Sequence, residues 1–451
     1  MDRENAVIGV TEEDLNYIIK ELFPLFPRFH TIGPVETPFT SAKVSLTIYE
    51  PPIVNIHEKC SSDAQLYRRE KNSGEFNGTS IQLHDRDPAL QSPHVEVSNI
   101  EFNLRILRCT LSFVHDQPNQ PKSQIPTSRS WRCALNLIAS LKVHASQTTP
   151  SLIVVIHNGK LITTGCEDDS ITNGVVVPVL IDYINKEILR PFPIPSVPIL
   201  KKLNLCVTHI SSQNHQLIVS SSTGKTTPRA SLPMGDWPGG AFIGVNAALL
   251  TAAANLITQE ISETEPEDAF KFLNCESNGR TKLGPVSQVR FMDSGLGNVA
   301  ARIAISYVTH TTLRMPWALP DITVKFCFDG EADITISVTI EDEKLSVGVR
   351  NVNDLVLGVR IDGMPDLLSD LLDMIAEVQC TLYKHASNFI FELLSDWQFS
   401  VAALSTPQLP RLKKDDPPLT IQLNDVQISP LDIGENTWLI ASGTPNISTE
   451  G

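Results

Sequence analysis

The residues of this chain that could carry out chemistry do not form a recognised site. Ser222–Lys225 matches the end of a phosphate-binding loop, but that motif needs a glycine five positions before Gly224, and Val219 stands there. The acidic run Glu167–Asp169 could bind a metal ion, although a solvated turn is the commoner role of such a run. We therefore expect neither a nucleotide site nor a metal site.

The sequence also lacks the signatures of common catalytic centres. It contains no His-Glu-x-x-His, no Cys-x-x-Cys and no Gly-x-Ser-x-Gly. Most of its histidines are dispersed, without pairing at helical spacing: His57, His84, His94, His115, His144, His157, His209 and His215. We predict that the protein is not an enzyme and uses no catalytic residue, metal ion or cofactor. A hydrolase is the weakest alternative, because no arrangement of a nucleophile supports it.

Charge and composition narrow the class of partner. The chain has 36 Lys and Arg against 51 Asp and Glu, and this net charge of −15 argues against nucleic acid as a partner. Its eight cysteines are scattered, which favours buried free thiols over a disulfide framework. The N-terminus lacks a basic region followed by an apolar run, and no run of about 18 apolar residues occurs. These features predict a soluble, cytoplasmic protein.

Two similar stretches organise the chain. Val7–Leu25 and Ala241–Gln259 both contain Ile-Gly-Val, then Thr11 or Asn246 as a helix N-cap, then an apolar helix. The residues at positions 4, 7, 8 and 11 after each cap form one apolar stripe: Leu15, Ile18, Ile19 and Leu22, and Leu250, Ala253, Ala254 and Ile257. The two motifs lie 235 positions apart, so we infer a tandem duplication of a whole domain.

The two copies also end alike. Val197–Thr223 and Leu409–Thr444 each contain Pro, Leu-Lys-Lys and two strands around a polar turn, and each follows an apolar helix, Val179–Leu189 or Pro365–Leu394. We predict a first unit over residues 1–225 with an insertion at 58–94, a linker at 226–240, and a second unit over 241–451.

The segments between these helices alternate between apolar and polar residues, as strands of antiparallel sheets do. Ala332–Ile340 is the clearest example, and Gly330-Glu331 before it predicts a hairpin turn. The fold class is thus α+β, with each unit a highly curved antiparallel sheet wrapped around a long amphipathic helix. Such a wrap leaves a groove that can stay open to an acyl chain, and Ala252–Ala254 predict space beside the second helix.

The segment Val179–Pro195, followed by Pro198–Leu203, resembles the closing segment of the tubular lipid-binding (TULIP) superfamily. This superfamily includes bactericidal/permeability-increasing protein, lipopolysaccharide-binding protein and cholesteryl ester transfer protein. The resemblance extends over the chain as a pattern of elements, and it implies two barrel-like units with elongated cavities for lipid tails. The acidic charge and the lack of a signal peptide depart from the secreted, endotoxin-binding members.

We therefore predict a lipid-binding or lipid-transfer protein whose partner is a lipid or other apolar ligand, with transient membrane contact during exchange. The alternative is a non-catalytic scaffold or complex subunit whose cavities are filled by its own side chains. Apolar residues at helical spacing can equally belong to the protein core instead of contacting a ligand. The residues predicted to contact lipid are Leu15, Ile18, Ile19, Leu22, Ile181, Ile184, Ile188, Leu250, Ala253, Ile257, Leu368, Leu371, Leu372 and Ile375.

Overall fold

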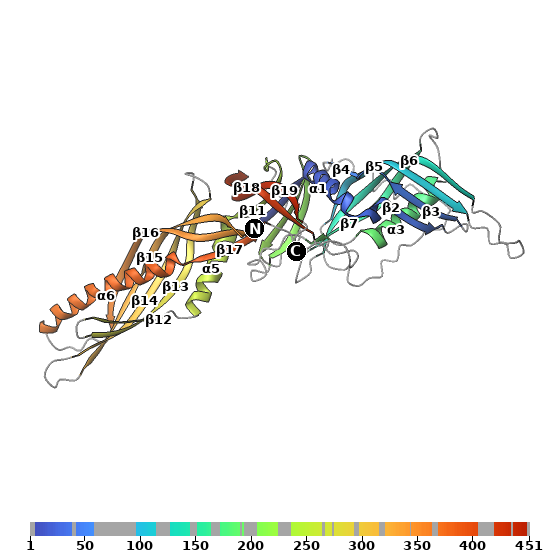
Figure 1. Cartoon of the computed structure of the whole chain (residues 1–451). Helices are drawn as coiled ribbons and strands as arrows, with labels where there is room; N and C mark the ends of the chain where they lie inside the picture. Colours follow the sequence, from blue (N-terminus) through green and yellow to red (C-terminus); the bar gives the residue numbers. More distant parts are fainter. Residues whose placement is uncertain are drawn as a thin grey trace, which may run out of the picture.

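Three antiparallel sheets follow one another along an elongated molecule (Figure 1). The computed structural model describes residues 5–37, 42–57, 96–113, 127–144, 151–163, 172–189, 192–193, 205–223, 236–263, 267–272, 275–292, 297–314, 321–342, 344–362, 369–404, 419–433 and 436–448. These residues are mostly in strands, with α-helices packed on the sheets. The predicted insertion lies outside them, as does the linker up to residue 235.

The central sheet joins the two halves of the chain. Its strand order is β18-β19-β11-β1-β10-β9, so β1 and β11 are neighbours and each has two further strands of its own half beside it. Ile8 lies opposite Ile243 in this antiparallel pair. The strands are β1 (Ala6–Thr11), β9 (Leu205–Gln213), β10 (Gln216–Thr223), β11 (Ala241–Asn246), β18 (Thr420–Ile433) and β19 (Asn436–Ser448).

The glycines of the two Ile-Gly-Val motifs permit close packing within the central sheet. A Cβ atom on Gly9 would lie 2.0 Å from the ring of Phe242, which is opposite it. A Cβ atom on Gly244 would lie 2.6 Å from Val7 and from Ile440. The shared motif therefore has a physical reason, because each strand leaves room for a bulky side chain beside it.

Both predicted N-caps are confirmed. The backbone N–H of Asp14 donates to Thr11 Oγ1 at 3.1 Å, where helix α1 (Glu12–Leu25) begins. The backbone N–H of Leu249 donates to Asn246 Oδ1 at 2.9 Å, at the start of α5 (Ala247–Glu263). Each cap satisfies one backbone donor that the first helical turn leaves unpaired.

The sheet of the first half has the order β2-β3-β5-β6-β7-β8, and β4 also pairs with β5. A short helix, α3 (Val177–Tyr183), continues on both sides as π-helical turns over Thr172–Val176 and Ile184–Ile188, close to the predicted helix. The strands are β2 (Thr31–Glu36), β3 (Ala42–Ile48), β4 (Ile53–Ile56), β5 (Glu96–Phe113), β6 (Thr127–His144), β7 (Ser151–Thr163) and β8 (Phe192–Pro193); the 3-10 helix η1 covers Pro27–His30.

The sheet of the second half runs in chain order from β12 to β17, with α5 and α6 (Ser369–Ser395) packed on it. Helix α6 buries every fourth side chain against the sheet: Val378, Leu382, Ala386, Ile390 and Leu394. The strands are β12 (Glu267–Phe272), β13 (Cys275–Phe291), β14 (Asn298–Leu313), β15 (Ile322–Glu341), β16 (Lys344–Asp362) and β17 (Gln398–Ala403).

One predicted turn is wrong. Gly330-Glu331 lies inside the continuous strand β15 rather than at a hairpin. A Cβ atom on Gly330 would lie 1.9 Å from the carbonyl oxygen of Val356 on β16, so this glycine permits the two backbones to approach. The predicted strand Ala332–Ile340 is confirmed as the second part of β15, with Ile334, Ile336 and Val338 buried.

The prediction of buried free thiols holds for four cysteines in the strands. Cys109, Cys133, Cys275 and Cys327 are buried and form no disulfide. Burial raises the pKa of the Cys133 thiol to about 11, which keeps it in the unreactive protonated form.

We predict that Gly9→Ala lowers the free energy of unfolding by about 1–3 kcal/mol, because the buried ring of Phe242 occupies the space that the methyl group needs. Chemical denaturation measures this difference. Gly239→Ala is the matched control, since no atom lies within 4 Å of its Cβ position. Equal unfolding midpoints for the two variants would contradict this account of the motif.

Candidate ligand-binding cavity

An apolar cavity of about 380 Å³ lies beside α1, where the first-half sheet meets the central sheet. Leu15, Ile18, Ile19 and Leu22 form the wall on the side of the helix. These four residues are the stripe that the sequence predicts, and the structure brings all of them to one surface. That they contact a ligand stays a prediction.

Both halves of the chain build the remaining walls. The first-half sheet contributes side chains from β4 to β7: Val54, Ile100, Phe102, Leu141 and Val154. The central sheet contributes residues from β1, β9, β10 and β11, among them Ile8, Val10, Ile210, Val219 and Phe242. The C-terminal part of the chain adds Leu404, Ile421, Gln422, Leu423 and Pro445. The cavity thus exists only where the two halves meet.

Several large side chains on these walls are only half-buried, which is unusual for aliphatic and aromatic residues surrounded by sheet and helix. They include Ile8, Val10, Leu15, Ile19, Leu22 and Phe102. Because no side chain of the described residues covers them completely, part of their apolar surface is open to an apolar ligand.

Hydrogen bonds to β4 hold α1 over the cavity. The side-chain amide of Asn16 donates to the Val54 carbonyl oxygen at 2.9 Å, and the Val54 N–H donates to Asn16 Oδ1 at 2.7 Å. One turn earlier, the carboxylate of Glu12 accepts from the Ile56 N–H at 2.7 Å. The side chains of α1 thus bond to the backbone of β4 as a neighbouring strand would. These bonds fix the distance between α1 and β4.

Ile181 and Ile184, two other predicted contact residues of the first half, do not line this cavity. Ile184 is buried in the first-half core and Ile181 packs against that core. The side chain of Ile188 lies outside the described set. The reason is that α3 lies on β7, with Asn185 bonded to both backbone groups of Ile156 at 2.9 and 2.8 Å.

Leu250, Ala253 and Ile257, predicted for the second half, do not line it either. Leu250 and Ala253 are buried in the second-half core, and Ile257 packs against it. The small residues Ala253 and Ala254 are fully covered rather than beside open space, because α5 approaches β13 closely. Leu368 lies outside the described residues, as do the side chains of Leu371, Leu372 and Ile375.

No group of three His, Cys, Asp or Glu side chains that could hold a metal ion occurs among the residues that the structure describes. The acidic run Glu167–Asp169 and residues 224–225 of the loop-like motif lie outside those ranges. Two of the dispersed histidines contact single carboxylates: His57 Nε2 lies 2.9 Å from Glu101, and His215 Nδ1 lies 3.6 Å from Glu12.

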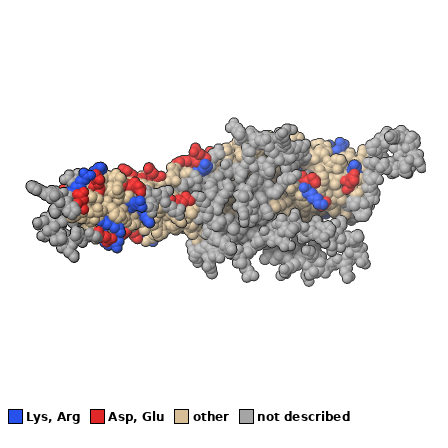
Figure 2. Space-filling model, turned by 90° about the horizontal axis from the view of Figure 1, so that it is seen from below, with Lys and Arg blue, Asp and Glu red and all other residues tan. Residues whose placement is uncertain are grey.

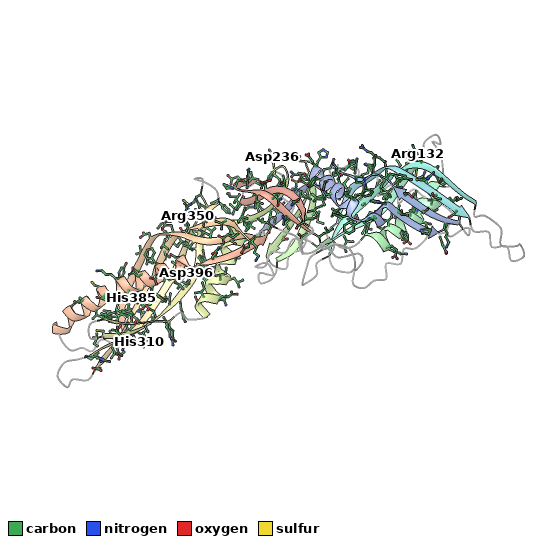
Figure 3. The ribbon with its side chains drawn as sticks, in the orientation of Figure 1. Arg132, Asp236, His310, Arg350, His385 and Asp396 are labelled. Carbon is green, nitrogen blue, oxygen red and sulfur yellow. The ribbon has the colours of Figure 1, made fainter. Side chains whose placement is uncertain are left out.

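One polar cluster was not predicted from the sequence. His385 on α6 (labelled in Figure 3) has its Nε2 2.7 Å from Asp268 Oδ2 on β12, and the hydroxyl of Tyr307 on β14 donates to the same oxygen at 3.1 Å. Burial and the nearby Asp268 carboxylate raise the pKa of Tyr307. Phe270 stacks on the His385 ring with centroids 3.5 Å apart. The cluster ties α6 to the sheet.

Charged side chains of both signs are interspersed over the second half on the face that Figure 2 shows. Ion pairs of the second half include Arg302 with Asp333 at 2.6 Å and Arg280 with Glu267 at 2.9 Å.

Comparison with solved structures found similar chains, among them lipopolysaccharide binding protein, which is 13% identical, with 98% of this chain and 99% of that chain covered and a TM-score of 0.28. P47 from Clostridium botulinum A2 is 11% identical, with 98% of this chain and 97% of that chain covered and a TM-score of 0.37. P47 of Clostridium botulinum E1 is 10% identical, with 99% of this chain and 100% of that chain covered and a TM-score of 0.36. No protein-family model and no curated protein sequence matches the chain. No described helix is both long and apolar enough to cross a membrane.

We predict that Asn16→Ala loosens α1 from β4 and lowers the free energy of unfolding by about 1–3 kcal/mol, because both backbone groups of Val54 lose their partner. Hydrogen exchange at the Val54 amide should become faster. Lys20→Ala, at an exposed position of the same helix, is the control. Unchanged exchange at Val54 in Asn16→Ala would show that the amide does not hold the helix.

Proposed function

We propose that this protein binds a lipid or another apolar chain in the cavity beside α1 and acts as a carrier rather than as an enzyme. The main support for the proposal is the apolar composition of the cavity wall. Half-buried aliphatic side chains of α1 face those of β1 and β10 across a space of about 380 Å³. Ligand cavities commonly measure about 300–1,000 Å³ and are mostly apolar.

The driving force in this proposal is removal of apolar surface from water. Each buried methylene contributes about 0.8 kcal/mol, so a chain of about ten methylenes gains about 8 kcal/mol before the costs of association. The ligand gains its contacts from side chains that are already ordered by α1 and the sheets, which reduces those costs.

We also propose that the chain arose by tandem duplication, with units over 1–225 and 241–451 joined by residues 226–240. The support is the central sheet, in which the strand order outward from β1 and β11 is the same and the two Ile-Gly-Val motifs face each other. The proposed ligand would lie where the two units meet, on the side of the first unit.

A scaffold or complex subunit is the second candidate function. It is favoured by the second half, where Leu250, Ala253 and Ala254 of α5 are buried by the protein's own side chains. Under this alternative, the cavity beside α1 would take up no apolar compound from solution.

We predict that Ile19→Trp fills the cavity and reduces uptake of a neutral fluorescent apolar probe, such as N-phenyl-1-naphthylamine, at least about tenfold. The midpoint of thermal unfolding should stay close to that of the wild type, since the added ring enters open space.

Lys20→Trp is the matched control, because residue 20 is exposed on the same helix and does not line the cavity. This variant should bind the probe as the wild type does. Undiminished uptake by a folded Ile19→Trp protein would rule out this cavity, and absence of uptake by the wild type would favour the scaffold.

A further inference from the structure

The face of the first-half sheet that points away from the core carries three arginines close together. Arg108 on β5 lies directly opposite Arg132 on β6, which is labelled in Figure 3. Both side chains are exposed, whereas their neighbours Leu107 and Cys133 are buried in the first-half core. Arg105, in the adjacent β-bulge of β5, is exposed as well. We call Arg105, Arg108 and Arg132 the arginine cluster.

Nothing in the described part of the chain neutralises the arginine cluster. No carboxylate there forms an ion pair with any of its three guanidinium groups. Like charges directly opposite each other on neighbouring strands destabilise a sheet. Hydroxyl side chains flank the cluster, because Thr47 lies opposite Arg108 and Thr110 lies opposite Ser130. Guanidinium and hydroxyl groups both donate hydrogen bonds, so this surface can bind carboxylates from outside the chain.

The face of the second-half sheet that points away from its core has the opposite charge pattern. It carries carboxylates from two neighbouring strands: Asp329, Glu331 and Asp333 on β15 and Asp354 on β16. We call these residues the acidic cluster. Asp333 lies directly opposite Asp354, so like charges again meet across two strands. Ala332 and Ile334, which alternate with them along β15, are buried in the second-half core.

Arginines of the same sheet neutralise only part of the acidic cluster. Arg302 on β14 has its Nε 2.6 Å from Asp333 Oδ1 and its Nη1 3.4 Å from Glu331 Oε2. Arg360 on β16 borders the cluster, but its Nε lies 3.6 Å from Asp362. The acidic cluster therefore keeps an excess of negative charge on an exposed surface.

Each cluster borders an exposed aliphatic side chain. Ile162 on β7 is 46% exposed and lies opposite Ala134, two residues along β6 from Arg132. Val356 on β16 is 63% exposed and lies opposite Glu331. Interfaces between proteins commonly combine apolar side chains with a polar and charged rim. The two surfaces are thus complementary in charge, and each offers apolar area that contact would remove from water.

We propose that copies of this chain associate, with the arginine cluster of one copy against the acidic cluster of another. The two clusters lie on different sheets of an elongated molecule, and both include exposed side chains in the single chain. A second copy supplies the complementary surface, and arginine–carboxylate contacts are charge-assisted and often bidentate. Because the two surfaces differ, each copy can make this contact once with each of them. This inference does not depend on the proposed ligand.

Sedimentation velocity of the full chain at about pH 7.5, where carboxylates are ionised, measures the association. We expect species larger than the monomer at about 0.1 M salt and a monomer at about 1 M salt. The reason is that the Debye length falls from about 10 Å to about 3 Å between these conditions. A monomer at both salt concentrations, with protein at up to about 100 μM, would overturn the proposal.

Two charge-reversal variants test which surfaces meet. The first combines Arg108→Glu with Arg132→Glu, and the second combines Glu331→Arg with Asp354→Arg. Each variant alone should associate at least about tenfold more weakly than the wild type, because its two surfaces then carry the same sign of charge. An equimolar mixture of the two variants should associate again, because one variant supplies acidic surfaces and the other supplies basic ones.

A control separates the two surfaces from net charge. Lys20→Glu with Lys384→Glu changes the net charge as much as the arginine variant does, at exposed positions outside both clusters. This control should associate as the wild type does. Equal weakening in the control and in the arginine variant would show that net charge governs the association. A mixture of the two charge-reversal variants that stays monomeric would also refute contact between the clusters.

Discussion

The antiparallel pairing of β1 with β11 is the constraint on which the rest of the structure depends. Ile8 and Ile243 lie opposite each other at its centre, and both line the cavity while they also pack against the second-half core. Gly9 and Gly244 make the pairing possible, because any larger side chain would meet Phe242 or Val7. Without this pair, neither the central sheet nor a cavity with walls from both halves would form.

Asparagine side chains solve a second problem, which is how a helix can lie against a curved sheet at a fixed distance. Asn16 of α1 bonds both backbone groups of Val54 on β4. In the same way, Asn185 and Asn173 each bond both backbone groups of one residue on β7, and Asn255 bonds those of Val286 on β13. A side-chain amide presents a donor and an acceptor as a strand backbone does, so it satisfies groups that would otherwise be unpaired. Helices held by such polar contacts need not be packed along their whole apolar face, and α1 leaves part of its face open.

The sequence predicted the elements that follow local rules. Caps, apolar stripes and alternating strands depend on neighbours within a few residues, and they placed Thr11, Asn246, α1 and the Leu15–Leu22 stripe correctly. The repeat also predicted that the two Ile-Gly-Val motifs are related, and they face each other in the sheet.

Long-range features could not be read in this way. A small residue can mark open space or close packing. Ala253 is fully buried, and Gly330 lies where β15 and β16 approach each other closely. Phe102 and Gln422 line the cavity, and His385 contacts Asp268, because of strand register and because segments far apart in the chain come together. No local pattern distinguishes these residues from ordinary strand and helix residues.

Photolabelling tests the central claim, that an apolar chain occupies the cavity beside α1, most directly. A long-chain alcohol with a diazirine group midway along its chain would be bound, activated by light, and mapped by mass spectrometry of peptides. The account predicts labels on segments that line the cavity, above all on Leu15–Leu22 and on Ile421–Leu423, and their loss when unlabelled alcohol competes. Labels confined to α6 or spread over the surface, without competition, would contradict it.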